Sequence, residues 1–163
     1  MDLSLLTLSE LLSLHGQINE DLRRRKIART ANNPTGDLAE YLFCKAFDWK
    51  QEDNSAKGFD AMSRNGIRYQ IKGRRLHNRN ISRQLSALRG LHDGPFDYLA
   101  GLLFTSNYTV LRAAIIPIEI VKKRAALVQR TNSYRFILHD DVWNEAGVVD
   151  VTQDLTLVLE REA

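Results

Sequence analysis

The run from Tyr98 to Phe104 constrains the fold most, because nearly all of its seven residues are apolar. Seven residues make a strand of ordinary length and fall far short of the ~20 that a membrane-spanning helix needs. A strand without polar alternation is typical of one that is covered on both faces. Ser106-Asn107 then indicates a turn into a partner strand over 109–116. The chain therefore predicts a sheet whose centre is buried between other elements.

Periodicity on either side of this run predicts helices as well as strands. A capping box at Thr7-Leu8-Ser9-Glu10 opens the first helix. Apolar residues at helical spacing predict helices over about residues 8–30, 34–46, 81–91 and 118–127. Strand patterns cover 48–51, 58–63, 67–73 and 134–138. We predict one domain over residues 1–163, of α/β (α+β) class, with a mixed sheet flanked by helices.

A hairpin is predicted where Arg64-Asn65-Gly66 separates two strand patterns. Residues 67, 69 and 71 are apolar and alternate with 68, 70 and 72, which are polar. A two-residue turn at Asn65-Gly66 would place Asp60 on the apolar face. A three-residue loop with Gly66 in the left-handed region instead places Asp60 opposite Gln70. We expect the second register, with a bulge beside Asp60 as the other route to the same result.

Positive charge is concentrated in residues 57–89, which hold nine basic groups and a single acid, Asp60. The segment after Arg89 holds seven basic groups and ten acids. The nine basic residues are Lys57, Arg64, Arg68, Lys72, Arg74, Arg75, Arg79, Arg83 and Arg89. Such asymmetry indicates either a surface that faces a polyanion or a solvated basic loop. Arg74 and Arg75 follow the second hairpin strand directly, so we expect them to contact a phosphate backbone.

Oxygen ligands and one ammonium group come together in the predicted register. Glu40 lies on the second helix, and Asp60 would lie beside Gln70 and Lys72 on the hairpin. Carboxylate and carbonyl oxygens are the ligands that Mg²⁺ prefers, so Asp60, Glu40 and the backbone carbonyl of Ile71 form a candidate metal site. Lys72 could orient a water molecule or stabilise developing charge. The alternative is that Asp60 and Lys72 form a surface ion pair and Glu40 is solvated.

These residues resemble the PD-(D/E)XK nuclease superfamily. The matching motifs are Gly36-Asp37-x-x-Glu40, Gly58-Phe59-Asp60 and Tyr69-Gln70-Ile71-Lys72. The resemblance covers about residues 34–116, with the first helix and an extension over 117–163 outside it. It implies a restriction-endonuclease-like fold with the core order α-β-β-β-α-β, and it implies that Glu40, Asp60, Gln70 and Lys72 are catalytic. Gln70 departs from the family pattern, which has Asp or Glu there.

The resemblance implies an endodeoxyribonuclease that uses Mg²⁺, with Mn²⁺ as a substitute, and cuts DNA by activating a water molecule. Cutting both strands would require two sites, so we expect a homodimer or a larger homo-oligomer. Two alternatives remain: an RNA-processing nuclease, and a module of the same fold that binds nucleic acid or protein without cutting. The single cysteine, Cys44, fits a small buried hydrophobe and a reducing cytoplasm. We expect no membrane partner, since the start of the chain carries Asp2 and Glu10 and lacks a basic leader.

Overall fold

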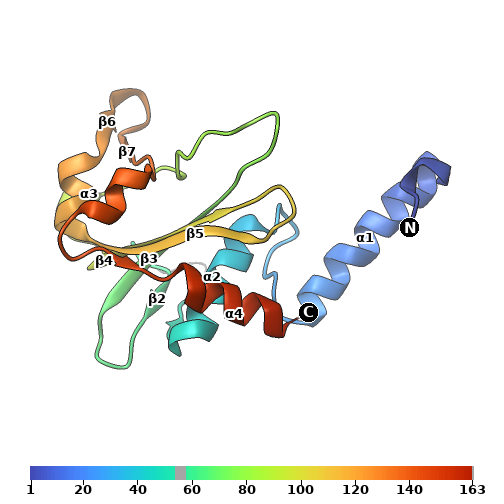
Figure 1. Cartoon of the computed structure of the whole chain (residues 1–163), viewed down its shortest axis with the longest axis horizontal. Helices are drawn as coiled ribbons and strands as arrows, with labels where there is room; N and C mark the ends of the chain where they lie inside the picture. The colour runs from blue at the N-terminus through green and yellow to red at the C-terminus, as the bar shows by residue number, and fades with distance from the viewer. Residues whose placement is uncertain (54–57, 163) are drawn as a thin grey trace.

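The apolar run over 98–104 is strand β4 (Tyr98–Phe104), in the middle of a six-stranded mixed sheet (Figure 1). The computed structural model describes residues 1–53 and 58–162. The sheet order is β1-β2-β3-β4-β5-β8, in which β3 and β4 are parallel and every other pair is antiparallel. The other strands of this sheet are β1 (Lys50–Gln51), β2 (Ala61–Met62), β3 (Arg68–Arg75), β5 (Val110–Pro117) and β8 (Val149–Asp150). The expected α/β class is confirmed.

Helices cover the sheet on both faces. Helices α2 (Thr35–Phe47) and α4 (Thr152–Arg161) lie on one face, over a core that includes Phe43, Ile71 and Leu155. The other face packs against α3 (Ile118–Arg124) and a small pair of strands, β6 (Ala126–Val128) and β7 (Ser133–Arg135). Burial on both faces explains why β4 carries almost no polar residue. Among the described residues, no helix is both long and apolar enough to cross a bilayer.

Helix α2 is held very close to β3, and its start is fixed by a buried carboxylate. Gly73 of β3 leaves no room for a side chain, because a Cβ there would lie 2.8 Å from the Cβ of Ala39. Asp37 in the first turn of α2 accepts hydrogen bonds from the backbone amides of Arg29 (2.8 Å) and Thr30 (2.9 Å). These contacts tie the segment before α2 to the helix and set the position of Glu40.

The hairpin between β2 and β3 has the expected register. Ala61 pairs with Tyr69, and Ser63 and Ile67 close a three-residue loop through the hydrogen bond from the Ser63 amide to the Ile67 carbonyl (2.9 Å). Gly66 has φ of +79°, the left-handed conformation that this loop needs. The three-residue loop and the register from Ala61 to Ser63 are confirmed, and the polar side chains of β3 lie on a common face.

The helix predicted over 81–91 is wrong, so the expected core order α-β-β-β-α-β lacks its second helix. The chain from 76 to 97 is mostly extended and contains only a short 3₁₀ helix, Leu91–Asp93. Leu85 and Leu88 are buried, as the spacing suggested. However, their amides donate to the carbonyls of Phe136 and Tyr134, both at 3.0 Å, and not along a helix. Pairing with a distant segment therefore replaced the local helical pattern.

The first helix, α1 (Leu8–Arg24), is shorter than the expected 8–30. Its capping box is confirmed, since Thr7 and Glu10 bond reciprocally at its first turn. Three further 3₁₀ helices, Leu3–Leu5, Gln129–Thr131 and Asp140–Asn144, lie outside the sheet. Figure 1 shows α1 projecting away from the sheet, and none of its residues is buried.

Candidate functional site

The candidate site lies where β2 begins, beside β3. The amide of Asp60 donates to the Tyr69 carbonyl (2.8 Å), although Tyr69 is the pairing partner of Ala61. The ladder therefore slips by one residue at Asp60. Phe59 consequently packs against the core on the far face of the sheet, and not with Ala61 as an unbroken strand would require. The expected pairing of Asp60 with Gln70 is therefore wrong. A bulge beside Asp60, the other predicted route, brings its side chain to β3.

Asp60 is bound to β3 through its side chain. One oxygen, Oδ2, accepts a hydrogen bond from the Ile71 amide (2.7 Å) and another from the side-chain amide of Gln70. Burial raises the pKa of Asp60, while the Ile71 hydrogen bond and the positive charge of Lys72 oppose that rise. Asp60, Gln70 and Lys72 are thus brought together as the sequence predicted.

Glu40 reaches the same region from α2. Its Oε2 accepts a hydrogen bond from the side-chain amide of Gln51 (2.7 Å) and forms an ion pair with Arg29. Burial raises the pKa of Glu40, and the negative charge of Asp60 raises it further. Two partly buried carboxyl groups that repel each other are characteristic of functional sites, because folding alone gives little reason to place them together.

Arg29 is the residue of this site that sequence analysis missed. Its guanidinium group pairs with Glu40 and donates to the backbone carbonyl of Glu52 (2.8 Å), while its Nε is buried with no hydrogen-bond partner in the described structure. The sequence placed residue 29 within the first helix, next to the basic run Arg23–Lys26. No local pattern could show that the chain turns after α1 and brings this arginine to Glu40.

The donor set fits a magnesium ion. The Ile71 amide faces Asp60, and a residue in a strand points its amide and carbonyl to the same edge. The Ile71 carbonyl therefore lies at the same edge of β3 as Asp60. Glu40 is close enough to Asp60 for their charges to interact, so the three groups supply hard oxygen ligands to one region. Mg²⁺ typically uses one or two carboxylates and keeps several waters, so this set is sufficient. Within residues 1–53 and 58–162, no three His, Cys, Asp or Glu side chains form a metal cluster, so a metal here needs the backbone oxygen.

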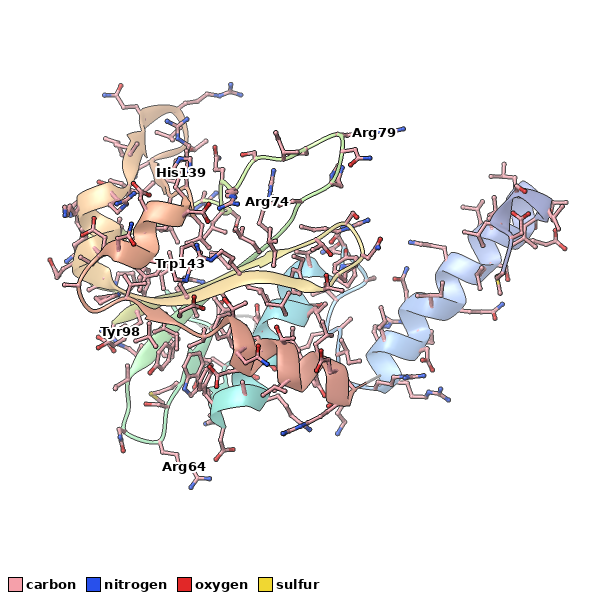
Figure 2. All side chains as sticks on the ribbon, viewed as in Figure 1. Arg64, Arg74, Arg79, Tyr98, His139 and Trp143 are labelled. Carbon is pink, nitrogen blue, oxygen red and sulfur yellow. The ribbon has the colours of Figure 1, made fainter. Side chains whose placement is uncertain are left out.

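Arg74 and Arg75 lie further along β3, at a separate pocket of about 270 Å³. Their Nε atoms donate to the backbone carbonyls of Ser82 (3.1 Å) and Ser106 (3.0 Å), and Arg75 also lies over the Tyr108 ring. Asn33 and Thr35, at the start of α2, line the pocket with Gly73, His77 and Asn80. Figure 2 shows Arg74 between the sheet and the 76–97 segment.

The remaining basic residues divide into two groups. Arg64, Arg68 and Arg83 form ion pairs with Asp48, Asp97 and Asp140. Among the described residues, Lys72, Arg74, Arg75, Arg79 and Arg89 form no ion pair with a carboxylate, and Lys57 lies outside those residues. Figure 2 shows Arg79 at the tip of the loop that follows β3, on the same side as Arg74 and far from Arg64. Uncompensated positive charge therefore continues from the candidate site onto this loop.

Cys44 packs at the edge of the core beneath the site. Burial raises the pKa of its thiol to about 12, and the charges of Glu40 and Asp60 add to the effect. A thiol with so high a pKa stays protonated at neutral pH and is a poor nucleophile. The small-hydrophobe interpretation of Cys44 is the one that this environment supports.

We compared the chain with known proteins. Neither a family model nor a curated protein sequence matches it.

Proposed function

We propose that the chain is a metal-dependent endodeoxyribonuclease with a restriction-endonuclease-like core. The observation that carries the proposal is the placement of Asp60. Its partly buried carboxylate is bound to the backbone of β3 next to Lys72 and lies close enough to Glu40 for the two charges to repel. An acid pair beside a lysine, on an irregular strand next to a basic loop, suits phosphodiester hydrolysis better than it suits stability alone.

Each residue has a distinct role in this proposal. Asp60, Glu40 and the Ile71 carbonyl would hold Mg²⁺, for which Mn²⁺ can substitute. When bound, the ion polarises the phosphate and lowers the pKa of a nearby water. Lys72 stabilises the negative charge that develops on the phosphate and orients the attacking water. Gln70 holds Asp60 in place through its side-chain amide, and its oxygen remains available as a neutral ligand.

DNA would approach along the side of β3 that carries Arg74 and Arg75. Each guanidinium group uses its Nε for a backbone carbonyl, so its terminal nitrogens are available to phosphate oxygens. Phosphate contacts of this kind give affinity without sequence information. A nucleic acid seated in this pocket would run beside Lys72, one residue before Gly73, and so reach the carboxylates.

A second function, binding of nucleic acid or protein without cutting, is favoured by one specific contact. Arg29 pairs with Glu40, so a cation of the chain itself neutralises one of the proposed metal ligands. In that case the Arg29 guanidinium takes the place of a metal beside Glu40, and the neutral Gln70 adds no negative charge that would attract one. RNA remains an alternative substrate, because phosphate contacts by Arg74 and Arg75 do not distinguish RNA from DNA.

One experiment separates these functions. Purified protein is incubated with plasmid DNA, single-stranded DNA and RNA, in Mg²⁺, Mn²⁺ or EDTA, and compared with Lys72→Ala and with Lys50→Ala, an exposed lysine on β1. We expect cutting of plasmid only with metal, a loss of roughly 100-fold or more in Lys72→Ala, and no change in Lys50→Ala. Cleavage by Lys72→Ala at the wild-type rate would refute the site. Binding without cleavage in every metal would favour the binding module.

A further inference from the structure

Helix α1 exposes an apolar stripe that nothing in the described chain covers. Leu8, Leu12 and Ile18 have exposed fractions of 74%, 64% and 51%, and no residue of the helix is buried. An isolated helix of this length is marginal in water, since most helices in proteins are stabilised by packing of their apolar face. Figure 1 shows α1 standing clear of the sheet. The stripe therefore needs a partner.

Four apolar positions of the stripe are symmetric about His15. The stripe contains Leu8, Leu11, Leu12, His15, Ile18 and Leu22. Two copies of the helix, packed antiparallel about a twofold axis at His15, would place Leu8 against Leu22 of the second copy and Leu12 against Ile18 of the second copy. Leu11 would lie beside Asn19 of the second copy, which makes a mixed apolar and polar pair. The two apolar pairs complement themselves, as a twofold interface requires.

Charge along the helix favours the same antiparallel arrangement. Residues 1–14 contain two acids, Asp2 and Glu10, and no basic side chain. Residues 20–26 contain four basic side chains and two acids, for a net charge of +2. Antiparallel packing places the acidic half of each helix beside the basic half of the other, whereas parallel packing places like charges together.

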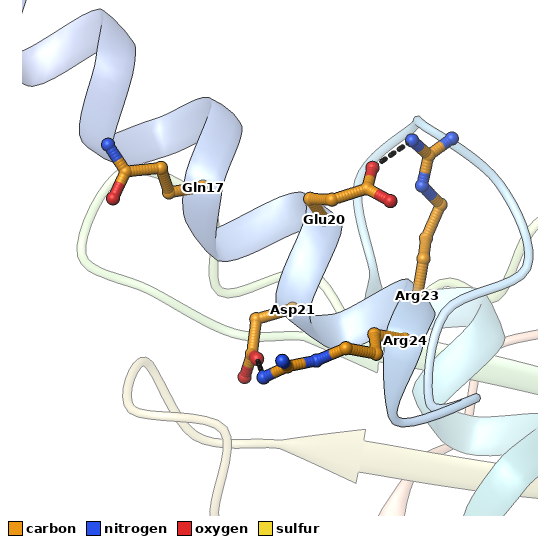
Figure 3. A pocket seen from close by; sticks show the side chains of 5 residues that line it. All are labelled: Gln17, Glu20, Asp21, Arg23 and Arg24. Atoms are coloured by element: carbon orange, nitrogen blue, oxygen red, sulfur yellow. Dashed lines mark hydrogen bonds and ion pairs between the residues drawn. The ribbon is translucent and has the colours of Figure 1, made fainter.

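The surface of α1 also distinguishes a docking side from a polar side. A hollow of about 510 Å³ at the end of the stripe is lined by Ile18, Leu22 and Ile27, with Gln17, Asp21 and Arg25 at its edge. The antiparallel arrangement brings Leu8 of the second copy to this hollow. Figure 3 shows the adjoining polar surface, which shares Gln17 and Asp21 with this hollow; there Glu20 pairs with Arg23 and Asp21 pairs with Arg24. Glu20, Arg23 and Arg24 are largely exposed, so this surface can remain in water.

We propose that α1 is a dimerisation helix, which pairs antiparallel with α1 of a second copy of this chain about His15. The partner is another copy because the apolar spacing and the charge distribution both complement themselves. The stripe on α1 shares no residue with the candidate nuclease site, so the dimerisation proposal does not depend on the proposed function. A dimer built in this way would also supply the two active sites that double-strand cleavage needs.

Oligomeric state tests the surface. The full chain is measured by sedimentation velocity and by light scattering, together with Leu12→Asp/Ile18→Asp and the matched control Ser9→Asp/Ser13→Asp. Ser9 and Ser13 are exposed and lie outside both the stripe and the hollow, so the control adds the same charge away from the proposed interface. We expect twice the monomer mass for the wild type and the control, and the monomer mass for the stripe variant. Because no α1 residue is buried, the melting temperature of the sheet domain should change little in the stripe variant.

Cysteine cross-linking tests the direction. In the antiparallel pair His15→Cys faces itself across the axis, whereas Leu8→Cys lies about 20 Å from its copy, too far for a disulfide. Oxidation should link His15→Cys and leave Leu8→Cys unlinked. Efficient linking of Leu8→Cys would overturn the antiparallel arrangement. A wild type that stays monomeric at 100 µM would overturn the proposal, whether or not it binds anionic lipid vesicles or DNA through α1.

Discussion

The sharpest prediction concerns Gly73, where β3 touches α2. A Cβ at this position would lie 2.8 Å from the Cβ of Ala39 and 2.9 Å from the Thr35 carbonyl oxygen, whereas ordinary contact begins at 3.4 Å. One of these atoms belongs to the backbone and the other is a methyl group fixed to it, so neither can rotate away. Gly73→Ala must therefore move α2 away from the sheet by about half an ångström.

The expected loss of stability follows from this forced separation. Overpacking of a well-packed core costs about 1–3 kcal/mol. In a chain of this length, 1 kcal/mol corresponds to roughly 2–4 °C in melting temperature. We expect Gly73→Ala to lower the melting temperature by about 2–12 °C, measured by calorimetry or circular dichroism.

The same shift should disturb the site, because Glu40 follows Ala39 on α2. The rise in melting temperature that Mn²⁺ produces should be smaller in Gly73→Ala than in the wild type. Gly36→Ala is the matched control: it lies in the same helix, and nothing stands within 4 Å of the added Cβ. We expect the control to melt at or slightly above the wild-type temperature, since alanine favours a helix over glycine by roughly 0.5–1 kcal/mol. A Gly73→Ala protein that melts within 1 °C of the wild type would refute the close packing of α2 on β3.

Three further predictions concern the site itself. Burial raises the pKa of Asp60 in the folded chain. Above this raised pKa the ionised carboxylate lowers the free energy of unfolding. The destabilisation disappears when the pH falls below the ordinary carboxyl pKa, because Asp60 is then protonated in both the folded and the unfolded chain. Asp60→Asn should therefore raise the melting temperature at pH 7 without metal, with a difference that disappears in acid; a lower melting temperature at pH 7 would contradict this account. Gln70→Glu removes the amide that donates to Asp60, so it should lower the metal-free melting temperature and enlarge the stabilisation by Mn²⁺; an unchanged Mn²⁺ effect would remove Gln70 from the metal environment. Arg74→Ala/Arg75→Ala should reduce the slope of the logarithm of the DNA-binding constant against the logarithm of salt concentration by roughly two. Arg64→Ala, which removes the ion pair with Asp48, should leave this slope unchanged. An unaltered slope in the double variant would mean that the pocket does not face phosphates.

The secondary structure near the site could be predicted because local sequence determines it. Alternation along 67–73 predicts a strand, and Gly66 permits the left-handed residue of a three-residue loop; both are present. The apolar run over 98–104 became β4 with the same bounds, since a strand buried on both faces needs no polar residue. The capping box likewise fixed the start of α1, because its hydrogen bonds lie within four residues.

Contacts between distant segments could not be predicted in the same way. Leu85, Leu88 and Leu91 have helical spacing, yet backbone pairing with residues 134 and 136 holds 85 and 88 extended, and such pairing leaves no local signature. Arg29 reaches Glu40 only because Asp37 binds the backbone of residues 29 and 30 and turns the chain there. The sequence by itself determined which residues of β3 share a face, through short-range periodicity. The tertiary structure alone decided that Arg29, Glu40 and Asp60 meet, because burial and charge pairing across the fold depend on contacts that no local pattern encodes.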